Sequence, residues 1–140
     1  MFNENQISFS VWDEKTIQKD LILKNIVIDR GSKYTLVAKK VTSKKEVSEF
    51  TKNLLKDDYF RKATHNSYAY RIKLDNWSIL ESKNDDGEFW AWMCILRELQ
   101  RENWTNMIII VTRYFGWIKL ENDRFKNVID ACKIFFKHLN

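Results

Sequence analysis

Residues 106–116 of the chain read NMIIIVTRYFG, and this stretch determines how the rest of the sequence is arranged. Met107–Val111 is continuously apolar and mostly β-branched. A short apolar run bounded by polar residues predicts a strand that is buried on both faces. Arg113 and Tyr114 follow directly, and a central strand commonly presents such side chains to a site at the sheet edge. The alternative is that Arg113 is a solvated strand end and Tyr114 a half-buried aromatic residue.

The composition is that of a single folded domain. The chain has 140 residues, of which 44% are hydrophobic and 14% aromatic, enough for a substantial core. No apolar run approaches the roughly 18 residues needed to cross a membrane, and no secretory signal is evident at the N-terminus. We therefore expect a cytoplasmic protein with no membrane contact. The net charge of +5 permits binding to RNA, to a ribosome or to an acidic protein surface, without requiring it.

The two cysteines are expected to be free. Cys94 and Cys132 are far apart in the sequence, show no metal-ligand spacing, and each falls on an apolar helical face. This pattern favours buried thiols in a reducing compartment over a disulfide.

Hydrophobic periodicity and turn residues predict the order of the elements. We expect a hairpin over residues 21–41 with its turn at 30–32 and helices over 43–56, 89–102 and 122–139. We also expect a strand that starts after His65 and runs to 72, strands over 77–80 and from 107 to 111, ending at 112–114, an extended piece at 117–120, and a short edge strand at 7–11. This order predicts an α+β fold, a mixed or antiparallel sheet with helices packed mainly on one face. We treat residues 1–25 as a short N-terminal extension and residues 26–140 as the domain.

The first predicted helix begins with a capping box, because Ser43 can accept a hydrogen bond from the backbone of Glu46, which can reach back. Val47, Phe50 and Leu54 then recur at helical spacing and should cover one sheet face. The other face carries a possible basic patch, which is either merely solvated or a footprint for RNA: Lys44, Lys45, Lys52 and Lys56.

The segment over residues 63–72 is dense in polar groups. Tyr68 and Tyr70 share one face, and Ala69 and Arg71 share the other. His65 and Asn66 stand at its start. They either satisfy backbone groups there or serve as ligands or catalytic groups.

The turn at residues 84–88 reads NDDGE. Its carboxylates could hold a hard cation, but the alternating ligand spacing of a calcium loop is missing, so no metal site is expected. Asp85 or Asp86 could instead cap the following helix or pair with an arginine. In that helix the apolar stripe consists of Phe89, Trp92, Met93, Leu96 and Leu99, widened by Trp90 and Cys94.

Four sequence blocks stand out: residues 29–34 (DRGSKY), 63–72 (ATHNSYAYRI), 85–88 (DDGE) and 111–116 (VTRYFG, with Ile118 and Leu120). Together they resemble the IMPACT family, whose bacterial members are the YigZ-type proteins. The block at 123–126 (DRFK) resembles the eukaryotic branch. The resemblance covers about residues 26–136.

This resemblance implies a fold similar to the second domain of a small-subunit ribosomal protein and to domain IV of the translocation elongation factor. It further implies a translation regulator that binds the large ribosome-associated activator of the initiation factor 2 kinase, restrains the starvation response and associates with actin. It implies no catalytic mechanism and no cofactor. The residues that we expect to form a polar network or partner surface are His65, Asn66, Tyr68, Arg71, Asp85, Asp86, Glu88, Arg113, Tyr114, Gly116 and Arg124.

The sequence departs from the family at three places. Eukaryotic members usually carry an N-terminal RWD domain, and we expect its partner contacts to be missing here. Residues 89–93 read FWAWM where the family has small residues, Trp117 follows Gly116 where the family has a second glycine, and Glu121 and Asn122 replace a glycine and its neighbour. Bulky residues at these positions predict that the family's pocket is closed, leaving a protein-binding surface.

Three functions remain open. The first is a non-catalytic regulatory binding module, and the second is electrostatic binding to RNA or the ribosome through the lysines of the first helix. The third is a hydrolase that uses His65 with Asp85, Asp86 and Arg113. A missing nucleophile motif and missing metal-ligand spacing argue against the third.

Overall fold

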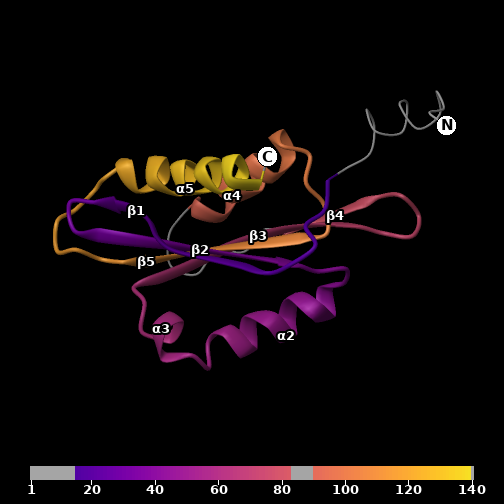
Figure 1. Cartoon of the computed structure of the whole chain (residues 1–140), viewed down its shortest axis with the longest axis horizontal. Helices are drawn as coiled ribbons and strands as arrows, with labels where there is room; N and C mark the ends of the chain where they lie inside the picture. The colour runs from indigo at the N-terminus through magenta and orange to yellow at the C-terminus, as the bar shows by residue number, and fades with distance from the viewer. Residues whose placement is uncertain (1–14, 83–89, 140) are drawn as a thin grey trace.

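A twisted sheet with helices on both faces forms the centre of the molecule (Figure 1). The computed structural model describes residues 15–82 and 90–139. Over these residues the elements are β1 (Leu21–Asp29), β2 (Ser32–Lys40), α2 (Lys44–Leu54), α3 (Asp58–Arg61), β3 (His65–Lys73), β4 (Ile79–Glu81), α4 (Ala91–Arg101), β5 (Met107–Tyr114) and α5 (Asp123–Leu139). The predicted α+β class is confirmed.

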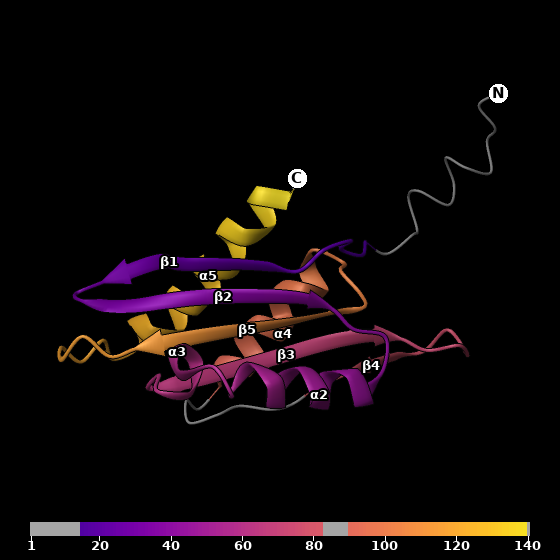
Figure 2. The same ribbon diagram turned by 60° about the horizontal axis from the view of Figure 1, so that its bottom comes forward.

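The sheet has the order β1-β2-β5-β3-β4, and every neighbouring pair is antiparallel (Figure 2). The last strand of the sequence is therefore the central one. It lies between the β1–β2 hairpin and the β3–β4 hairpin. Met107–Arg113 is buried throughout, which confirms that this run is covered on both faces.

Two hydrophobic cores lie on opposite faces of the sheet. On one face, Tyr34, Leu36 and Ile109 pack beneath α4 and α5. On the other face, Val37 and Ile110 belong to a second core that includes residues of α2 and α3. The helices α4 and α5 thus share one face of the sheet, as predicted. The helices α2 and α3 form a layer on the other face (Figure 1). A central strand that is apolar at every position leaves two faces to cover, which accounts for the second layer.

The edge strand β1 contains a bulge. Its pairing with β2 is regular up to Leu23 and resumes at Val27, so residues 24–26 lie opposite the single residue Thr35 and two of them are extra. Asn25 within the bulge has a left-handed backbone (φ 54°), and its N–H donates to Thr35 Oγ1 at 3.3 Å. The bulge increases the local twist of the edge and interrupts its regular hydrogen-bonding pattern.

The predicted cap of α2 is present with one difference. Ser43 Oγ accepts from the backbone N–H of Glu46 at 3.1 Å. The Glu46 carboxylate reaches back to Thr42, one residue earlier than in a standard capping box, and accepts from its N–H at 2.6 Å and its hydroxyl at 2.8 Å. These bonds lower the pKa of Glu46.

Two other helices agree with their predicted stripes to different degrees. In α5, Val128, Cys132 and Phe135 are buried as expected. The helix α4 begins at Ala91, and its fully buried Ile95 was absent from the predicted stripe, whereas Met93 is only half-buried. A continuous run of apolar residues in this segment concealed which side of the helix faces the core.

Turn geometry delays the start of the strand predicted at 77–80, which is present as β4, and replaces the extended piece predicted at 117–120. Trp77 and Trp117 have left-handed backbones, with φ of 71° and 70°. Trp77 therefore lies in the turn before β4, and residues 117–120 are not a strand. The predicted strand at 7–11 and the acidic turn at 84–88 lie outside the described residues.

The cysteines are free thiols, as predicted, with Cys132 buried and Cys94 half-buried. Burial raises the pKa of the Cys132 thiol. Among the described helices, none combines the length and hydropathy that crossing a membrane would require.

Candidate functional site

Three of the sequence blocks singled out above meet at one end of the sheet. In the central strand, Arg113 pairs with Tyr34 of β2 on one side and with His65 of β3 on the other. The β1–β2 turn, the start of β3 and the end of β5 therefore lie side by side, at the left in Figure 2. We call this region, made of residues 29–35, 64–66 and 112–117, the motif end.

Arg113 is an interior residue of this end. Its side chain belongs to the α4/α5 face, in a cross-strand row between Tyr34 and His65. Only 7% of Arg113 is exposed, and its guanidinium carbon lies 5.5 Å from the centre of the Phe115 ring. Arg113 is therefore not a solvated strand end, and the expectation that it is presented to a site stays a prediction. Tyr114 is half-buried, as the alternative predicted.

The neighbouring row on the α2/α3 face is a buried polar network. Thr112 Oγ1 donates to Asn66 Oδ1 at 2.7 Å, and Asn66 Nδ2 donates to the carbonyl of Phe60 at 3.0 Å. On the β2 side, the hydroxyls of Thr35 and Tyr59 are 2.8 Å apart. Asn66 thus satisfies a backbone carbonyl of α3, and the network holds α3 against the sheet.

At the motif end, the backbone at Gly116 lies in direct contact with the backbone of the β1–β2 turn. A Cβ placed on Gly116 would lie 2.1 Å from the carbonyl carbon of Gly31 and 2.3 Å from the nitrogen of Ser32. The Gly116 N–H donates to Ser32 Oγ at 3.0 Å, and the Phe115 N–H donates to Thr64 Oγ1 at 2.9 Å. Only glycine fits at position 116, because no side chain can be accommodated between these two backbones.

A surface cluster of charges ties the same end to α5. Arg30 donates to Asp29 through two nitrogens at 3.0 Å and to Asp123 Oδ2 at 2.5 Å. Asn127 Nδ2 donates to Asp29 Oδ2 at 2.9 Å. These bonds, that of Arg30 first, hold the pKa of Asp29 at about 2. Asp123 and Asn127 were not among the predicted site residues, because only the folded chain brings them to the hairpin turn.

An open pocket of about 500 Å³ adjoins the motif end on the α3 side. Its walls are Asn25, Gly31, Lys33, Tyr59, Tyr114, Phe115, Gly116 and Trp117. Tyr59 and Tyr114 pack together, with ring centres 5.1 Å apart. Burial raises the pKa of Tyr114 to about 12, so its phenol stays neutral. The sequence signal for this pocket was weak, because Tyr59 comes from α3 and reaches it only through the register of the sheet.

The structure separates other predicted site residues from the motif end. Arg71 lies six residues from His65 along β3, about 20 Å away at the rise of a strand. Its guanidinium donates to Glu81 Oε2 at 2.9 Å and to the carbonyl of Trp104 at 3.1 Å, which is a structural role. Tyr68 packs in the α2/α3 core. Asp85, Asp86 and Glu88 lie outside the described residues.

Arg124 lies near the start of α5. It donates to the carbonyl of Glu121 at 2.6 Å and stacks on the ring of Phe125, with 4.4 Å between the guanidinium carbon and the ring centre.

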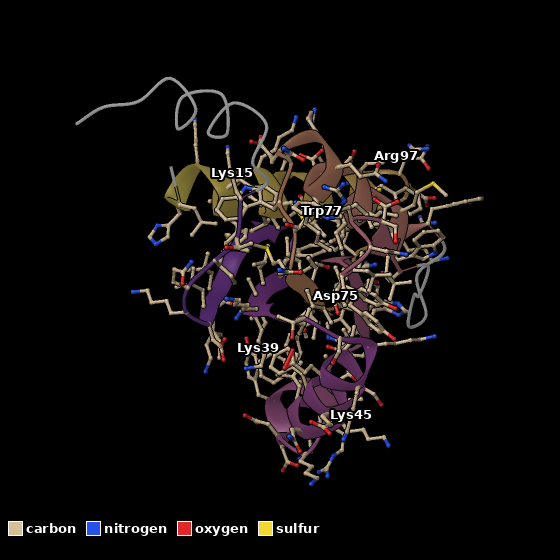
Figure 3. The ribbon with its side chains drawn as sticks, turned by 90° about the vertical axis from the view of Figure 1, so that its right-hand side faces the viewer. Lys15, Lys39, Lys45, Asp75, Trp77 and Arg97 are labelled. Carbon is tan, nitrogen blue, oxygen red and sulfur yellow. The ribbon has the colours of Figure 1, made fainter. Side chains whose placement is uncertain are left out.

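The possible basic patch on α2 is accessible. Lys44, Lys45, Lys52 and Lys56 are all exposed. Figure 3 shows Lys45 on the α2 side of the molecule, opposite Arg97 of α4. Among the described residues, no three His, Cys, Asp or Glu side chains gather closely enough to hold a metal ion.

Trp117 is 88% exposed and forms a wall of the open pocket, so it does not fill a groove. This finding removes one of the reasons to expect a closed pocket. The complete hypothesis also involves Asp86 and Phe89, outside the described residues, and stays a prediction.

Comparison with known proteins gives consistent matches. Residues 30–134 match the model of the Impact N-terminal domain. The chain is 36% identical over 107 residues to a protein IMPACT homolog of Dictyostelium discoideum, and 34% identical over 108 residues to protein IMPACT of Homo sapiens. Each match covers 76% of this chain, but only 31% and 34% of those relatives. The chain thus spans about a third of the length of the curated relatives that it matches.

Two solved structures resemble the fold. One is the two-domain translational regulator Yih1, with a TM-score of 0.56 and 31% identity, covering 81% of this chain and 43% of that one. The other is a crystal structure of a hypothetical protein, with a TM-score of 0.65, covering 86% of this chain and 62% of that one. At 17% identity, the second shows a shared fold alone.

Proposed function

Because the chain belongs to the family of the Impact N-terminal domain, we propose that it is a regulatory binding domain of translation control. The match over residues 30–134 carries this proposal, since it includes four of the five described strands and most of α5. The likeness to a two-domain translational regulator at 31% identity supports it.

The partner that we propose is the ribosome-associated activator of the kinase that phosphorylates initiation factor 2. Binding to this activator would restrain the amino-acid starvation response in the cytoplasm; actin is a further candidate partner. Ser32, Thr35, Asn66, Thr112 and Arg113 of the motif end are buried, so they position the surface instead of contacting the partner. The exposed Arg30 and Asp123, with the neighbouring half-buried Arg124, are charged side chains available for contact.

The test measures the phosphorylated fraction of initiation factor 2 in amino-acid-starved eukaryotic cells that express the chain. We expect phosphorylation to fall, and the double variant Asp123→Lys with Arg124→Glu to weaken this effect. Arg97→Glu, on the exposed side of α4, is the matched control and should act like the wild type. Unchanged phosphorylation with a folded, well-expressed chain would contradict the proposal.

A second candidate function is electrostatic binding to the ribosome or to RNA. The observation that favours it is the row of exposed lysines on α2. Sedimentation with ribosomes should then weaken steeply as salt rises, because bound phosphates release counterions. Lys52→Gln with Lys56→Gln should reduce this salt dependence, whereas Lys133→Gln with Lys137→Gln on α5 should not. Binding that is independent of salt would exclude this function.

The hydrolase alternative depends on His65. It predicts that His65→Ala abolishes the biological activity of the chain. Full activity of that variant in the starvation assay would count against a catalytic role.

A further inference from the structure

Trp117 is an unusual residue for a loop. It is 88% exposed, and its backbone is left-handed with φ of 70°. A bulky residue in this region is strained, and burial here provides little compensation. Strained residues persist where the surrounding structure holds them, and they concentrate at functional sites. The exposed indole therefore points to a contact outside the chain.

The pocket beside Trp117 has aromatic walls. Phe115 packs edge-on to the Trp117 ring, with ring centres 5.7 Å apart, and the packed pair Tyr59 and Tyr114 also lines the pocket. Tyr59 is fixed by its hydrogen bond to Thr35. A volume of about 500 Å³ falls within the usual range for ligand pockets, about 300–1,000 Å³. The site can therefore receive a flat ring without rearrangement of the sheet.

The charged groups near these rings include two lysines and one carboxylate, Asp57, which helps to raise the pKa of Tyr114. Lys33 lines the pocket and is exposed, and the ammonium group of Lys24 lies 4.6 Å from the centre of the Tyr59 ring. Of the described residues that line the pocket, none is acidic. A ligand with planar rings and negative charge is complementary to this surface.

We propose that this pocket binds single-stranded RNA, with a base stacked on Trp117 and the backbone phosphates near Lys24 and Lys33. Exposed aromatic side chains beside basic ones are how proteins hold single strands without reading a sequence. Stacked bases of a duplex are not available to such a pocket. The proposal concerns a different surface from the α2 lysines, and it does not depend on the kinase pathway.

A proline-rich peptide is the other ligand class that uses aromatic-lined grooves. Such a peptide offers no negative charge to Lys24 and Lys33, whereas RNA offers its phosphates, so the charges favour RNA as the ligand. The binding test therefore includes a proline-rich peptide as a competitor of the RNA.

The test uses fluorescence anisotropy of a labelled ten-nucleotide oligouridylate with the full chain. Trp117→Gly removes the indole and relieves the left-handed backbone, so the variant should fold. We expect its affinity to fall about 5- to 150-fold, the loss of one stacked base. Trp77→Gly is the matched control, because Trp77 is 78% exposed with φ of 71° in the turn before β4, and it should bind like the wild type.

Equal affinities of Trp117→Gly and the wild type would overturn the proposal, as would equal losses in the two glycine variants. Trp117→Phe should recover part of the binding. Lys33→Gln should lower the slope of log affinity against log salt by about 0.7 for one phosphate contact. Binding of a proline-rich peptide without binding of the oligouridylate would also overturn it. None of these results bears on the phosphorylation assay, so the two proposals fail separately.

Discussion

The two ends of the sheet are built in different ways. At the motif end, two backbones touch at Gly31 and Gly116, and buried polar side chains bridge the strands. At the opposite end, side chains connect the elements: Arg71 reaches Glu81 and the carbonyl of Trp104. A substitution at the opposite end removes individual side-chain hydrogen bonds. At the motif end, a side chain added to Gly116 would overlap the backbone that it touches. The motif end is therefore the less tolerant of substitution.

Both ends also share one feature. Each has an exposed tryptophan with a left-handed backbone, Trp117 at the motif end and Trp77 at the other. At Trp77 the ammonium group of Lys73 lies 4.4 Å from the centre of the ring, whereas the Trp117 ring adjoins a pocket. Similar strain thus occurs beside a lysine at one end, and beside Phe115 and an open pocket at the other.

Gly116→Ala should give the largest effect, a loss of about 3 kcal/mol or more in the free energy of unfolding. Its Cβ would overlap the Gly31 and Ser32 backbones, which cannot move without separating the hairpin turn from β5. Urea denaturation measures the loss. Asp75→Ala in the turn at the opposite end should change stability by less than about 0.5 kcal/mol. Equal urea midpoints for the two variants would show that the two ends of the sheet tolerate substitution equally.

Thr112→Val should cost about 1–2 kcal/mol, because it leaves the buried Asn66 oxygen without its donor. The corresponding change at the opposite end is Glu81→Gln, which weakens the bond to Arg71. That change should cost less, because 31% of the Glu81 side chain is exposed and water screens the pair. Unfolding in urea compares the two, and a larger loss for Glu81→Gln would reverse the comparison.

Trp117→Gly and Trp77→Gly should both stabilise the protein. A left-handed backbone costs a non-glycine residue about 1–2 kcal/mol, and the greater freedom of glycine in the unfolded chain offsets part of the gain. We expect about 0.5–1 kcal/mol for Trp117→Gly, and less for Trp77→Gly, which also loses its contact with Lys73. Thermal melting of both variants measures the difference. A lower melting temperature for Trp117→Gly would show that the indole supports the fold.

Asp29 should make the motif end sensitive to acid. Its pKa in the folded protein is about 2, below the ordinary value of 3.8, so the folded state favours the ionised form. The stability from this group is present above pH 4 and is lost as the pH falls from about 4 to 2. When the free energy of unfolding is measured over this pH range, it should fall less steeply with pH for Asp29→Asn than for the wild type.

Local patterns were enough to predict most of the fold. The continuous apolar run of β5 predicted a strand with two covered faces, and the serine at position 43 predicted the start of α2. The register of β3 on β5 had no such local signal, because pairing between distant strands depends on the whole sheet. It is this register that places His65 beside Arg113 and brings the candidate site together.

The turns were the least predictable part. Left-handed backbones occur at Asn25, Trp77, Trp90, Asn103, Asn106, Trp117 and Glu121, and also at Arg30 in the one hairpin turn that the sequence did predict. Glycine would have marked such positions in the sequence, but the chain has only three glycines. Tryptophan gives no turn signal, so the extended piece predicted after Gly116 was wrong. The pocket beside Trp117 depends on that turn and was missed for the same reason.

The position of β5 has a consequence for how the chain folds during synthesis. The β1–β2 and β3–β4 hairpins are complete by residue 81, yet β5 at residues 107–114 separates them in the sheet. A nascent chain that has not reached this strand carries two half-sheets, each with an unpaired apolar edge. The central strand then has to insert between them, which is a non-local and therefore slow step. A chain stalled before residue 107 would expose both edges and is the form most prone to aggregate.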